Sequence, residues 1–433
     1  MLYIKNGRVV DPVTQTDEML DVFVDDGKIV KVLKPVEAEI FLKTQQNEKE
    51  IDPEVLDATG CVVSPGLMDV HVHFRDPGFT YKEDIYSGAK VALAGGITTV
   101  VLMANTKPVV DNEETLSYVI EKGKETGLHV KTCAAISKDL KGKELVDMEL
   151  LKAKGAVGFT DDGIPLSDDS FVRKAMEEAV RLKMPLSFHE ENPAYIANNG
   201  INKGKASEHF QIGGSDRQAE ISMIERDIEL AKETGAIIDI QHISTKEGVA
   251  LVREARTSYP NIHAEATPHH FSLTEDAAIL HGTLGKMNPP LRTEEDRKAI
   301  IEALADGTIE IIATDHAPHA KEEKDKGVTE APSGILGLET ALPLAVTNLV
   351  RPGHMSLLQV IERMTVGPAT LYNFEPNSVQ EGKTADLVIF NPDETFVYEK
   401  SLSKSQNSPF LRQTFYGKIY ATITDGNVVY RAE

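Results

Sequence analysis

Two histidines, His71 and His73, stand two positions apart in the apolar run VVSPGLMDVHVHF (62–74). Residues two apart on a β-strand project from the same face, so both imidazoles can reach one metal ion. Imidazole is a common ligand of zinc, and a metal site is therefore the first hypothesis for this segment. The alternative is a pair of hydrogen-bonded histidines inside the core.

Further polar residues stand at the ends of other short apolar runs. They are Arg75, Asn105, Asp161, Asp162, His189, His242, Asp315 and His319. Two more histidines and two aspartates in equivalent places strengthen the metal hypothesis, because this ligand set suits zinc. An ordinary catalytic zinc takes three protein ligands, so the larger set predicts two ions that share a carboxylate and a hydroxide. Asp315 could orient and deprotonate that hydroxide as a general base.

These side chains can meet only if the segments that bear them lie side by side. Eight short β-branched runs alternate with amphipathic stretches of helical spacing. The runs are 62–74, 97–106, 129–137, 156–163, 184–191, 237–244, 261–270 and 309–319. Strand and helix alternating eight times predict an α/β protein with a (β/α)8 TIM-type barrel. Such barrels carry their active sites at the carboxyl ends of the strands, where the polar residues stand.

Both ends of the chain have a different pattern. YIKNGRVV and DVFVDDGKIVKV near the start, and KTADLVIF and GKIYATITDGNVVY near the end, alternate apolar and polar residues and contain Asp-Gly turn signals. We therefore expect a small β-sandwich domain built from residues 1–60 and 372–433, around a metal-dependent barrel at 61–371. The polar stretch 41–56 is expected to be an exposed loop.

Composition narrows the class of protein. The 433 residues include 46 Lys and Arg against 68 Asp and Glu, a formal charge of −22 that argues against nucleic-acid or membrane-surface binding. No run approaches the roughly 18 apolar residues needed to cross a bilayer. Cys61 and Cys133, the two cysteines, cannot form a disulfide framework and suit a reducing cytosol. We expect a cytoplasmic protein that acts on a small molecule.

Six motifs carry a resemblance over the whole chain. They are HVHFRDPG (71–78), ANT (104–106), FTDDG (159–163), HEEN (189–192), MNPPLR (287–292) and ATDHAPH (313–319). Together they resemble the bacterial dihydroorotases, a family of the amidohydrolase superfamily. HFRDPG with TDHAPH is the most specific part. Allantoinases and dihydropyrimidinases share the histidine pair, but typically lack the Arg-Asp after it and the histidine of the last motif.

The resemblance implies reversible cyclisation of N-carbamoyl-L-aspartate to L-dihydroorotate in de novo pyrimidine (UMP) synthesis, with two Zn²⁺ per subunit. It implies that His71, His73 and Asp315 hold one zinc and that His189 and His242 hold the second. Many superfamily members bridge the ions with a carboxylated lysine, whereas the subgroup resembled here uses an aspartate. The alternation of side chains along a strand does not decide whether Asp161 or Asp162 is this bridging aspartate. The matching FTDDG motif favours Asp162, which would bridge the two ions together with a hydroxide.

The substrate of such an enzyme carries a carboxylate that takes no part in ring closure. A planar guanidinium binds a carboxylate through paired hydrogen bonds, and Arg75 is placed to do so. An ion pair with Asp76 or another carboxylate is the structural alternative for Arg75. The resemblance adds further substrate contacts from His73, Asn105, Asn288, His319, Ser333 and Gly334. Many relatives carry an aromatic residue where this chain has Ser333.

Two other functions stay open. Another cyclic amidase would act on hydantoin, dihydropyrimidine or allantoin, but these substrates lack the carboxylate that Arg75 and His319 would bind. An inactive scaffold subunit for aspartate transcarbamoylase would be expected to have lost metal ligands, whereas every ligand position is filled here. A homodimer and a complex with aspartate transcarbamoylase are the candidate assemblies.

Overall fold

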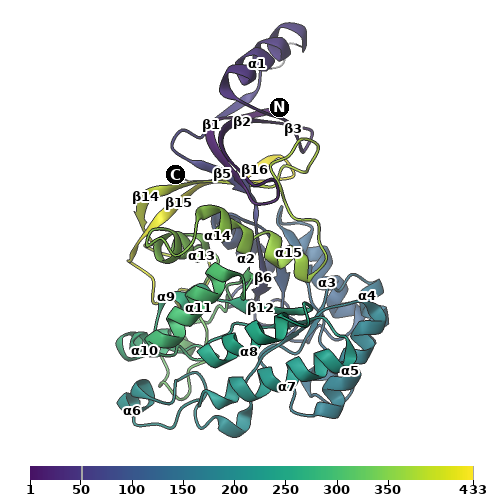
Figure 1. Cartoon of the computed structure of the whole chain (residues 1–433), viewed down its shortest axis with the longest axis vertical. Helices are drawn as coiled ribbons and strands as arrows, with labels where there is room; N and C mark the ends of the chain where they lie inside the picture. The colour runs from purple at the N-terminus through teal and green to yellow at the C-terminus, as the bar shows by residue number, and fades with distance from the viewer. Residues whose placement is uncertain (50–51, 433) are drawn as a thin grey trace.

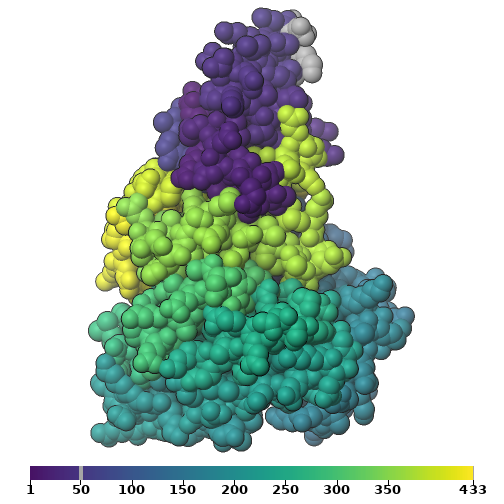
Figure 2. Space-filling model, in the orientation of Figure 1, coloured from purple at the N-terminus to yellow at the C-terminus, as the bar shows by residue number. Residues whose placement is uncertain are grey.

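The computed structural model describes residues 1–49 and 52–432. Two parts follow one another along its longest axis (Figure 1). Segments from both ends of the chain form the narrow part, and the middle of the chain forms the broad part (Figure 2). The functional residues predicted from sequence belong to the broad part, so the narrow part matters here for how it supports the other.

One eight-stranded sheet joins the two ends of the chain. Its strands are β1 (Leu2–Asp11), β2 (Thr16–Asp25), β3 (Lys28–Leu33), β4 (Glu54–Asp57), β5 (Val62–Pro65), β14 (Leu387–Val397), β15 (Thr414–Thr424) and β16 (Asn427–Arg431). The order is β16-β15-β14-β5-β1-β2-β3, with β4 paired to β1. The two Asp-Gly turns connect β2 to β3 and β15 to β16 as predicted. Strands from both termini therefore share one sheet. That this part of the molecule is a β-sandwich stays a prediction.

The prediction of an exposed loop at 41–56 is wrong for most of this segment. Residues Pro35–Lys49 form helix α1, and β4 follows it, while residues 50–51 lie outside the described part. The helix packs Phe41 against the sheet, where its ring lies 4.8 Å from that of Phe23, and Ala38 is fully buried. Most of its other side chains are exposed, including Val36 and Ile40. A helix at the edge of a molecule buries few residues, so its composition resembled that of a loop.

Each of the eight predicted runs contains a parallel strand. These are β6 (Leu67–Val72), β7 (Ile97–Leu102), β8 (His129–Thr132), β9 (Phe159–Thr160), β10 (Leu186–Phe188), β11 (Ile238–Ile240), β12 (Ile262–Ala266) and β13 (Ile311–Ile312). They form two arrays, β6-β7-β8 and β9-β10-β11-β12-β13. Single parallel bridges, Ala134 with Phe159 and Val72 with His316, join the arrays at both seams. The fold is thus α/β with parallel sheets, and all eight carboxyl ends belong to neighbouring strands.

The first run, 62–74, divides into two strands at Gly66. β5 pairs with β1 and β14 in the terminal sheet, whereas β6 pairs with β7. A Cβ atom on Gly66 would lie 2.3 Å from the Thr98 side chain, so a larger residue would collide there. The proposed division of the chain at residues 60 and 371 stays a prediction.

Helices cover the outer sides of the parallel strands. They are α2 (Ile85–Ala94), α3 (Glu113–Gly123), α4 (Met148–Ala153), α5 (Asp169–Leu182), α6 (Lys205–Phe210), α7 (Gln218–Thr234), α8 (Lys246–Arg256), α9 (Pro268–Ser272), α10 (Glu275–His281), α11 (Glu294–Asp306), α12 (Lys321–Lys324), α13 (Ala341–Ala345), α14 (Leu357–Arg363) and α15 (Val366–Leu371). Short helical turns are η1 (Lys138–Leu140), η2 (Pro193–Tyr195), η3 (Gly282–Gly285) and η4 (Val346–Val350).

Helix α5 illustrates why these segments are helical. Its N-cap, Asp168, accepts hydrogen bonds from the backbone N–H groups of Ser170 and Phe171. Phe171 and Val172 begin a buried stripe at helical spacing that faces the strands. Among the described residues, none of the helices is both long and apolar enough for a bilayer crossing.

Candidate metal centre and active site

The six predicted metal ligands converge at the carboxyl ends of the parallel strands. In the first group, His71, His73 and Asp162 place their ligand atoms within 4.8 Å of one another. Asp315 Oδ1 lies 3.0 Å from His73 Nε2 and 3.6 Å from His71 Nε2. These four side chains come from three strand ends that are far apart in sequence. One cation could contact all four.

A second group uses the other side of the same aspartate. Asp162, His189 and His242 also place their ligand atoms within 4.8 Å of one another. His189 Nδ1 lies 3.0 Å from His242 Nε2 and 3.8 Å from Asp162 Oδ1. All three residues are buried. Asp162 therefore lies between two groups of nitrogen donors, as a carboxylate shared by two cations would.

The donor atoms fit divalent metal ions. His71 is fully buried, and its Nε2 atom has no hydrogen-bond partner among residues 1–49 and 52–432, although it lies 3.3 Å from Asp162 Oδ1. A buried polar atom without a partner costs free energy unless a ligand uses it. On the other side of the ring, Nδ1 lies 2.8 Å from Glu265 Oε2. A carboxylate that accepts a hydrogen bond from one ring nitrogen directs the lone pair of the other toward a metal.

Electrostatics also favour a cation at this place. Burial by itself would raise the pKa of Asp162, but the adjacent imidazoles of His71, His73 and His189 hold that pKa well below its usual range. Asp162 is therefore ionised. Burial, together with His189 and His71, lowers the pKa of His242 well below the usual value. His242 is consequently a neutral imidazole, the form that binds metals.

Hydrogen bonds hold the ligands in position. Asn105 Oδ1 lies 2.9 Å from His73 Nδ1, and its amide nitrogen donates to Asp162 Oδ2 over 3.2 Å. On the other side, His189 Nε2 lies 3.0 Å from Glu191 Oε2. Asn105 is predicted above to contact substrate, and it does line the cavity. Its two polar atoms are nevertheless used to orient His73 and Asp162.

The neighbouring aspartate, Asp161, has a different environment. Its carboxylate accepts hydrogen bonds from the backbone N–H groups of Ile136 and Ser137, at 2.7 and 3.0 Å, and from the Ser137 hydroxyl. Burial raises the pKa of Asp161. This side chain ties the loop after β8 to the end of β9. Of the two aspartates that the pattern of residues leaves open, Asp162 alone lies among the histidines.

A cavity of about 250 Å³ opens beside the ligands. Its lining includes all of the predicted substrate contacts: His73, Arg75, Asn105, Asn288, His319, Ser333 and Gly334. The Asn288 amide nitrogen lies 3.2 Å from His189 Nε2, while its buried Oδ1 has no hydrogen-bond partner among the described residues. The residues predicted from the motifs therefore do meet in one cavity, and at least one buried acceptor there is available to a ligand.

Arg75 has no carboxylate partner in the part of the chain that the structure describes. Asp76, the structural alternative, instead binds Lys122 Nζ at 2.6 Å and the Tyr118 hydroxyl at 2.9 Å. Arg75 Nε donates to the Pro318 carbonyl over 3.2 Å, and one of its terminal nitrogens lies 3.4 Å from His319 Nε2. Within the described residues, no ion pair includes Arg75. Its charge is consequently available to an anion in the cavity.

Three residues of the site have left-handed backbone conformations. The φ angles are 60° at Arg75, 36° at His242 and 48° at Asp315. This region is unfavourable for residues other than glycine, and such residues cluster at functional sites, where the surrounding structure holds them. The strand ends turn sharply at these positions, and the turns direct the three side chains into the cavity.

Glu265 and Glu191 were not singled out from the sequence. Glu265 lies in β12, and its contact with His71 makes it part of the metal-binding arrangement. A single acidic residue inside the otherwise apolar run IHAEA is a signal that could have identified it, because a buried carboxylate needs a partner. Glu191 lies within the HEEN motif, two residues after a predicted ligand.

Comparisons with known proteins agree with the site. Residues 62–429 match the model of the Amidohydrolase family. The dihydroorotase of Clostridioides difficile (strain 630) is 53% identical over all of both chains. That of Clostridium acetobutylicum is 48% identical over 99% of both chains, and that of Streptococcus pneumoniae serotype 4 is 47% identical over all of both. The chain belongs to the amidohydrolase family, and its full-length relatives support dihydroorotase function, the hydrolysis of a cyclic amide.

Solved structures with a similar fold carry different names. The L-hydantoinase (dihydropyrimidinase) from Arthrobacter aurescens has a TM-score of 0.86 at 25% identity, over 99% of this chain and 96% of that one. The dihydropyrimidinase from Brevibacillus agri NCHU1002 has a TM-score of 0.84 at 22% identity, over 99% and 95%. These similarities concern the fold, and the cavity residues must distinguish the substrates.

Proposed function

We propose that this dihydroorotase interconverts N-carbamoyl-L-aspartate and L-dihydroorotate at a centre of two zinc ions. In this proposal His71, His73 and Asp315 hold one ion, His189 and His242 hold the other, and Asp162 bridges them. The observation that carries the proposal is the unpaired guanidinium of Arg75, in the same cavity as two groups of metal ligands. A cyclic amide with a carboxylate on its ring matches both features.

In ring opening, the metal ions would polarise the ring carbonyl and lower the pKa of a shared water. Arg75 binds the substrate carboxylate, with His319 beside it, and so fixes the distance between the ring and the metal ligands. Asp315 accepts the proton of the attacking water and passes it to the ring nitrogen as the C–N bond breaks. In ring closure the same residue acts in the reverse order. The unpartnered Oδ1 of Asn288 can accept an N–H of the ring.

Hydantoinases are the alternative that the structural similarity raises. Their names refer to a cyclic amide, hydantoin, which has no carboxylate. Such a substrate would leave the partly buried guanidinium of Arg75 without an anionic partner, and that costs binding free energy. The cavity therefore favours dihydroorotate over hydantoin.

A direct test follows the loss of dihydroorotate by ultraviolet absorbance, with bound zinc assayed in the same sample. We expect turnover that a chelator removes and added zinc restores. If the protein binds two zinc ions and does not turn over dihydroorotate, the proposed substrate is contradicted, and hydantoin and allantoin would be assayed next. Absence of both metal and turnover would favour a scaffold, which mixing with aspartate transcarbamoylase would examine.

We also infer that the two parallel arrays form one closed (β/α)8 barrel. The single bridges between β8 and β9 and between β6 and the end of β13 support this. Two further expectations stay predictions: a cytoplasmic location and assembly as a homodimer or with aspartate transcarbamoylase. Sedimentation of the purified chain, alone and with the transcarbamoylase, tests both assemblies.

A further inference from the structure

We infer that Lys286 and Lys324 are positioning residues for the substrate pocket, because they clamp the segment 331–334 that carries Ser333 and Gly334. The inference rests on the proposed function, since it concerns the wall of the same cavity. Neither lysine lines that cavity, so neither would touch the substrate. Their role is to hold the groups that do.

The clamp consists of hydrogen bonds to three of the four backbone carbonyls of this segment. Lys286 Nζ donates to the Ala331 carbonyl over 2.7 Å. Lys324 Nζ donates to the Pro332 carbonyl over 2.8 Å and to the Gly334 carbonyl over 3.2 Å. In addition, the Gly334 N–H donates to the Lys286 carbonyl over 2.9 Å. A four-residue segment without helix or strand is thereby fixed on both sides of Ser333.

The remaining carbonyl of the segment holds a predicted substrate-binding residue. His319 Nε2 lies 2.8 Å from the Ser333 carbonyl, which can only accept, so this nitrogen carries the proton. Asn407, from the C-terminal segment, donates to the Gly334 carbonyl over 3.1 Å and accepts the His319 N–H over 3.0 Å. The segment and His319 are therefore held as one unit beside Arg75.

The two ammonium groups are unusual in being buried without an acidic partner. Lys286 is 5% exposed and Lys324 is 4% exposed, and neither takes part in an ion pair within the described residues. Burial lowers the pKa of Lys324 to about 7. Burying an ammonium away from carboxylates opposes folding. Stability therefore does not explain these residues, whereas the geometry of the pocket wall does.

The segment also reaches across the cavity. The Ser333 hydroxyl donates to Asn199 Oδ1 over 3.0 Å, and both residues line the cavity. A Cβ atom on Gly200 would lie 2.3 Å from the Ser333 hydroxyl and 2.8 Å from the Lys286 side chain. The loop at 199–200 thus packs tightly on the clamped segment. Releasing the clamp would move this wall and free the His319 ring.

The test compares the variants Lys286→Met and Lys324→Met with the unchanged protein. Methionine keeps most of the side-chain volume and removes the donor. Because the carboxylate of dihydroorotate takes no part in the reaction, weaker contact with it raises KM and leaves kcat nearly unchanged. We expect KM to rise about 10-fold in each variant, with kcat within about threefold and bound metal unchanged. Lys286→Arg keeps a hydrogen-bond donor, so its KM should lie close to that of the unchanged protein.

Lys321→Met is the matched control. Lys321 lies on the same short helix, α12, as Lys324, but it is exposed and pairs with Asp325. Its substitution should leave KM within about twofold. Unchanged KM in both buried-lysine variants would overturn the inference. So would a joint loss of metal and kcat, because that indicates general structural damage.

Hydrogen exchange of the peptide 328–338 provides a measurement that needs no substrate. The amides of this peptide should exchange faster in Lys286→Met and Lys324→Met than in the unchanged protein, and at the unchanged rate in Lys321→Met. Equal exchange in all four proteins would contradict the clamp. Failure of the unchanged protein to turn over dihydroorotate would contradict the proposed function instead, and the exchange result would still decide the inference.

Discussion

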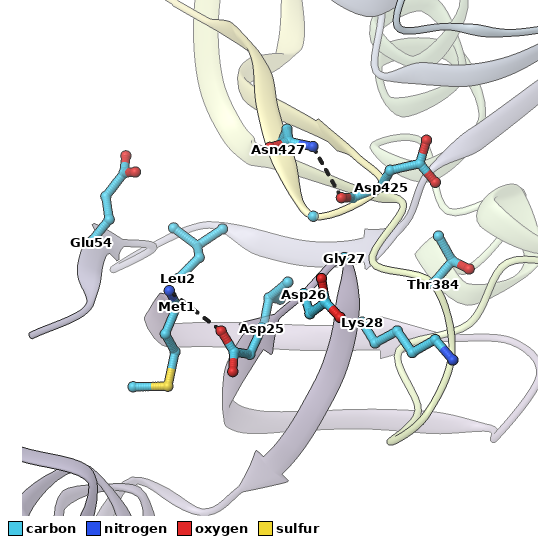
Figure 3. A pocket seen from close by; sticks show the side chains of 12 residues that line it. Met1, Leu2, Asp25, Asp26, Gly27, Lys28, Glu54, Thr384, Asp425 and Asn427 are labelled. Atoms are coloured by element: carbon cyan, nitrogen blue, oxygen red, sulfur yellow. Dashed lines mark hydrogen bonds and ion pairs between the residues drawn. The ribbon is translucent and has the colours of Figure 1, made fainter. Parts of the chain in front are cut away.

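Two cavities of this molecule differ in size and in chemistry. The larger, of about 610 Å³, lies on the terminal sheet and is lined by residues from both ends of the chain (Figure 3). The smaller, of about 250 Å³, lies at the ends of the parallel strands. The acidic residues that line the larger cavity, Asp25, Asp26, Glu54 and Asp425, are exposed, and Asp25 pairs with the terminal amino group over 3.6 Å. Water can solvate all of them.

In the smaller cavity the histidines and Asp162 are buried and face one another. His71 is fully buried, and Asp162 is 3% exposed. Taking such groups out of water is costly, so their convergence calls for a ligand that repays the loss of hydration. The comparison teaches that buried, mutually directed donor atoms indicate a functional site better than volume does. If this is correct, substitutions in the smaller cavity should have large effects on activity, and those near the larger cavity should act on stability.

The largest effect is expected for Asp315→Asn. The amide cannot accept the proton of the attacking water, so turnover should fall by about 10³-fold or more in both directions. Assays of dihydroorotate loss and formation, with bound zinc measured in the same samples, check this. Near-normal turnover in a variant that holds its full metal content would remove Asp315 from the mechanism.

Asp162→Asn and Asp161→Asn form the next comparison. Asp162 lies between the two groups of histidines, so its loss should lower metal affinity by about 100-fold or more. Asp161 binds backbone N–H groups in the loop after β8, and its substitution should lower stability with metal affinity unchanged. Competition with a zinc chelator measures the affinities, and thermal unfolding measures the stabilities. Equal metal affinities in the two variants would show that the bridge has been assigned to the wrong aspartate.

Arg75→Met should weaken substrate binding and retain the metals. Loss of a paired guanidinium–carboxylate contact is expected to raise KM by about 30- to 100-fold. Lys122→Met is the control, because Lys122 binds the adjacent Asp76 outside the cavity. That variant should keep its KM within about twofold. Loss of zinc from Arg75→Met with an unchanged KM would mean that this arginine is structural.

The contrast between the two parts also shows what could be predicted from the sequence. The eight parallel strands were predicted because each is a short apolar run with polar residues at its carboxyl end. The Asp-Gly turns of the terminal sheet were predicted for an equally local reason. Helix α1 was missed because it buries little, and the separation of β5 from β6 was missed because one apolar run continues through both. In these cases the neighbouring segments, not the local pattern, decide the structure.

The candidate site shows the same division. Its ligands stand on strand ends, where placement along the chain indicates where they will meet. The residues that hold them come from elsewhere: Glu265 binds His71, and Asn407 connects Gly334 with the backbone of His319. These pairs are distant in sequence and have no characteristic spacing. Only the folded chain brings them together.

The smallest effect is expected beside the larger cavity, at His129. Its Nε2 atom lies 3.1 Å from Asp386 and 3.9 Å from Asp425, which lines that cavity. The hydrogen bond to Asp386 raises the pKa of His129 above its usual value, and the opposing effect of burial is smaller. A histidine whose pKa is higher in the folded than in the unfolded state stabilises the fold below its unfolded pKa, about 6.5. This contribution is lost as the pH rises through the folded pKa.

His129→Gln should therefore lower stability in acid and have little effect in base. Since the pair is partly exposed, we expect a loss of about 0.5–1 kcal/mol near pH 5.5 that disappears near pH 9. Thermal unfolding of both proteins at the two pH values measures the difference, and kcat/KM at neutral pH should stay unchanged. An equal loss at both pH values would mean that packing, and not charge, is what His129 contributes. A fall in kcat/KM would break the comparison itself, because it would connect the exposed cavity to the chemistry of the buried one.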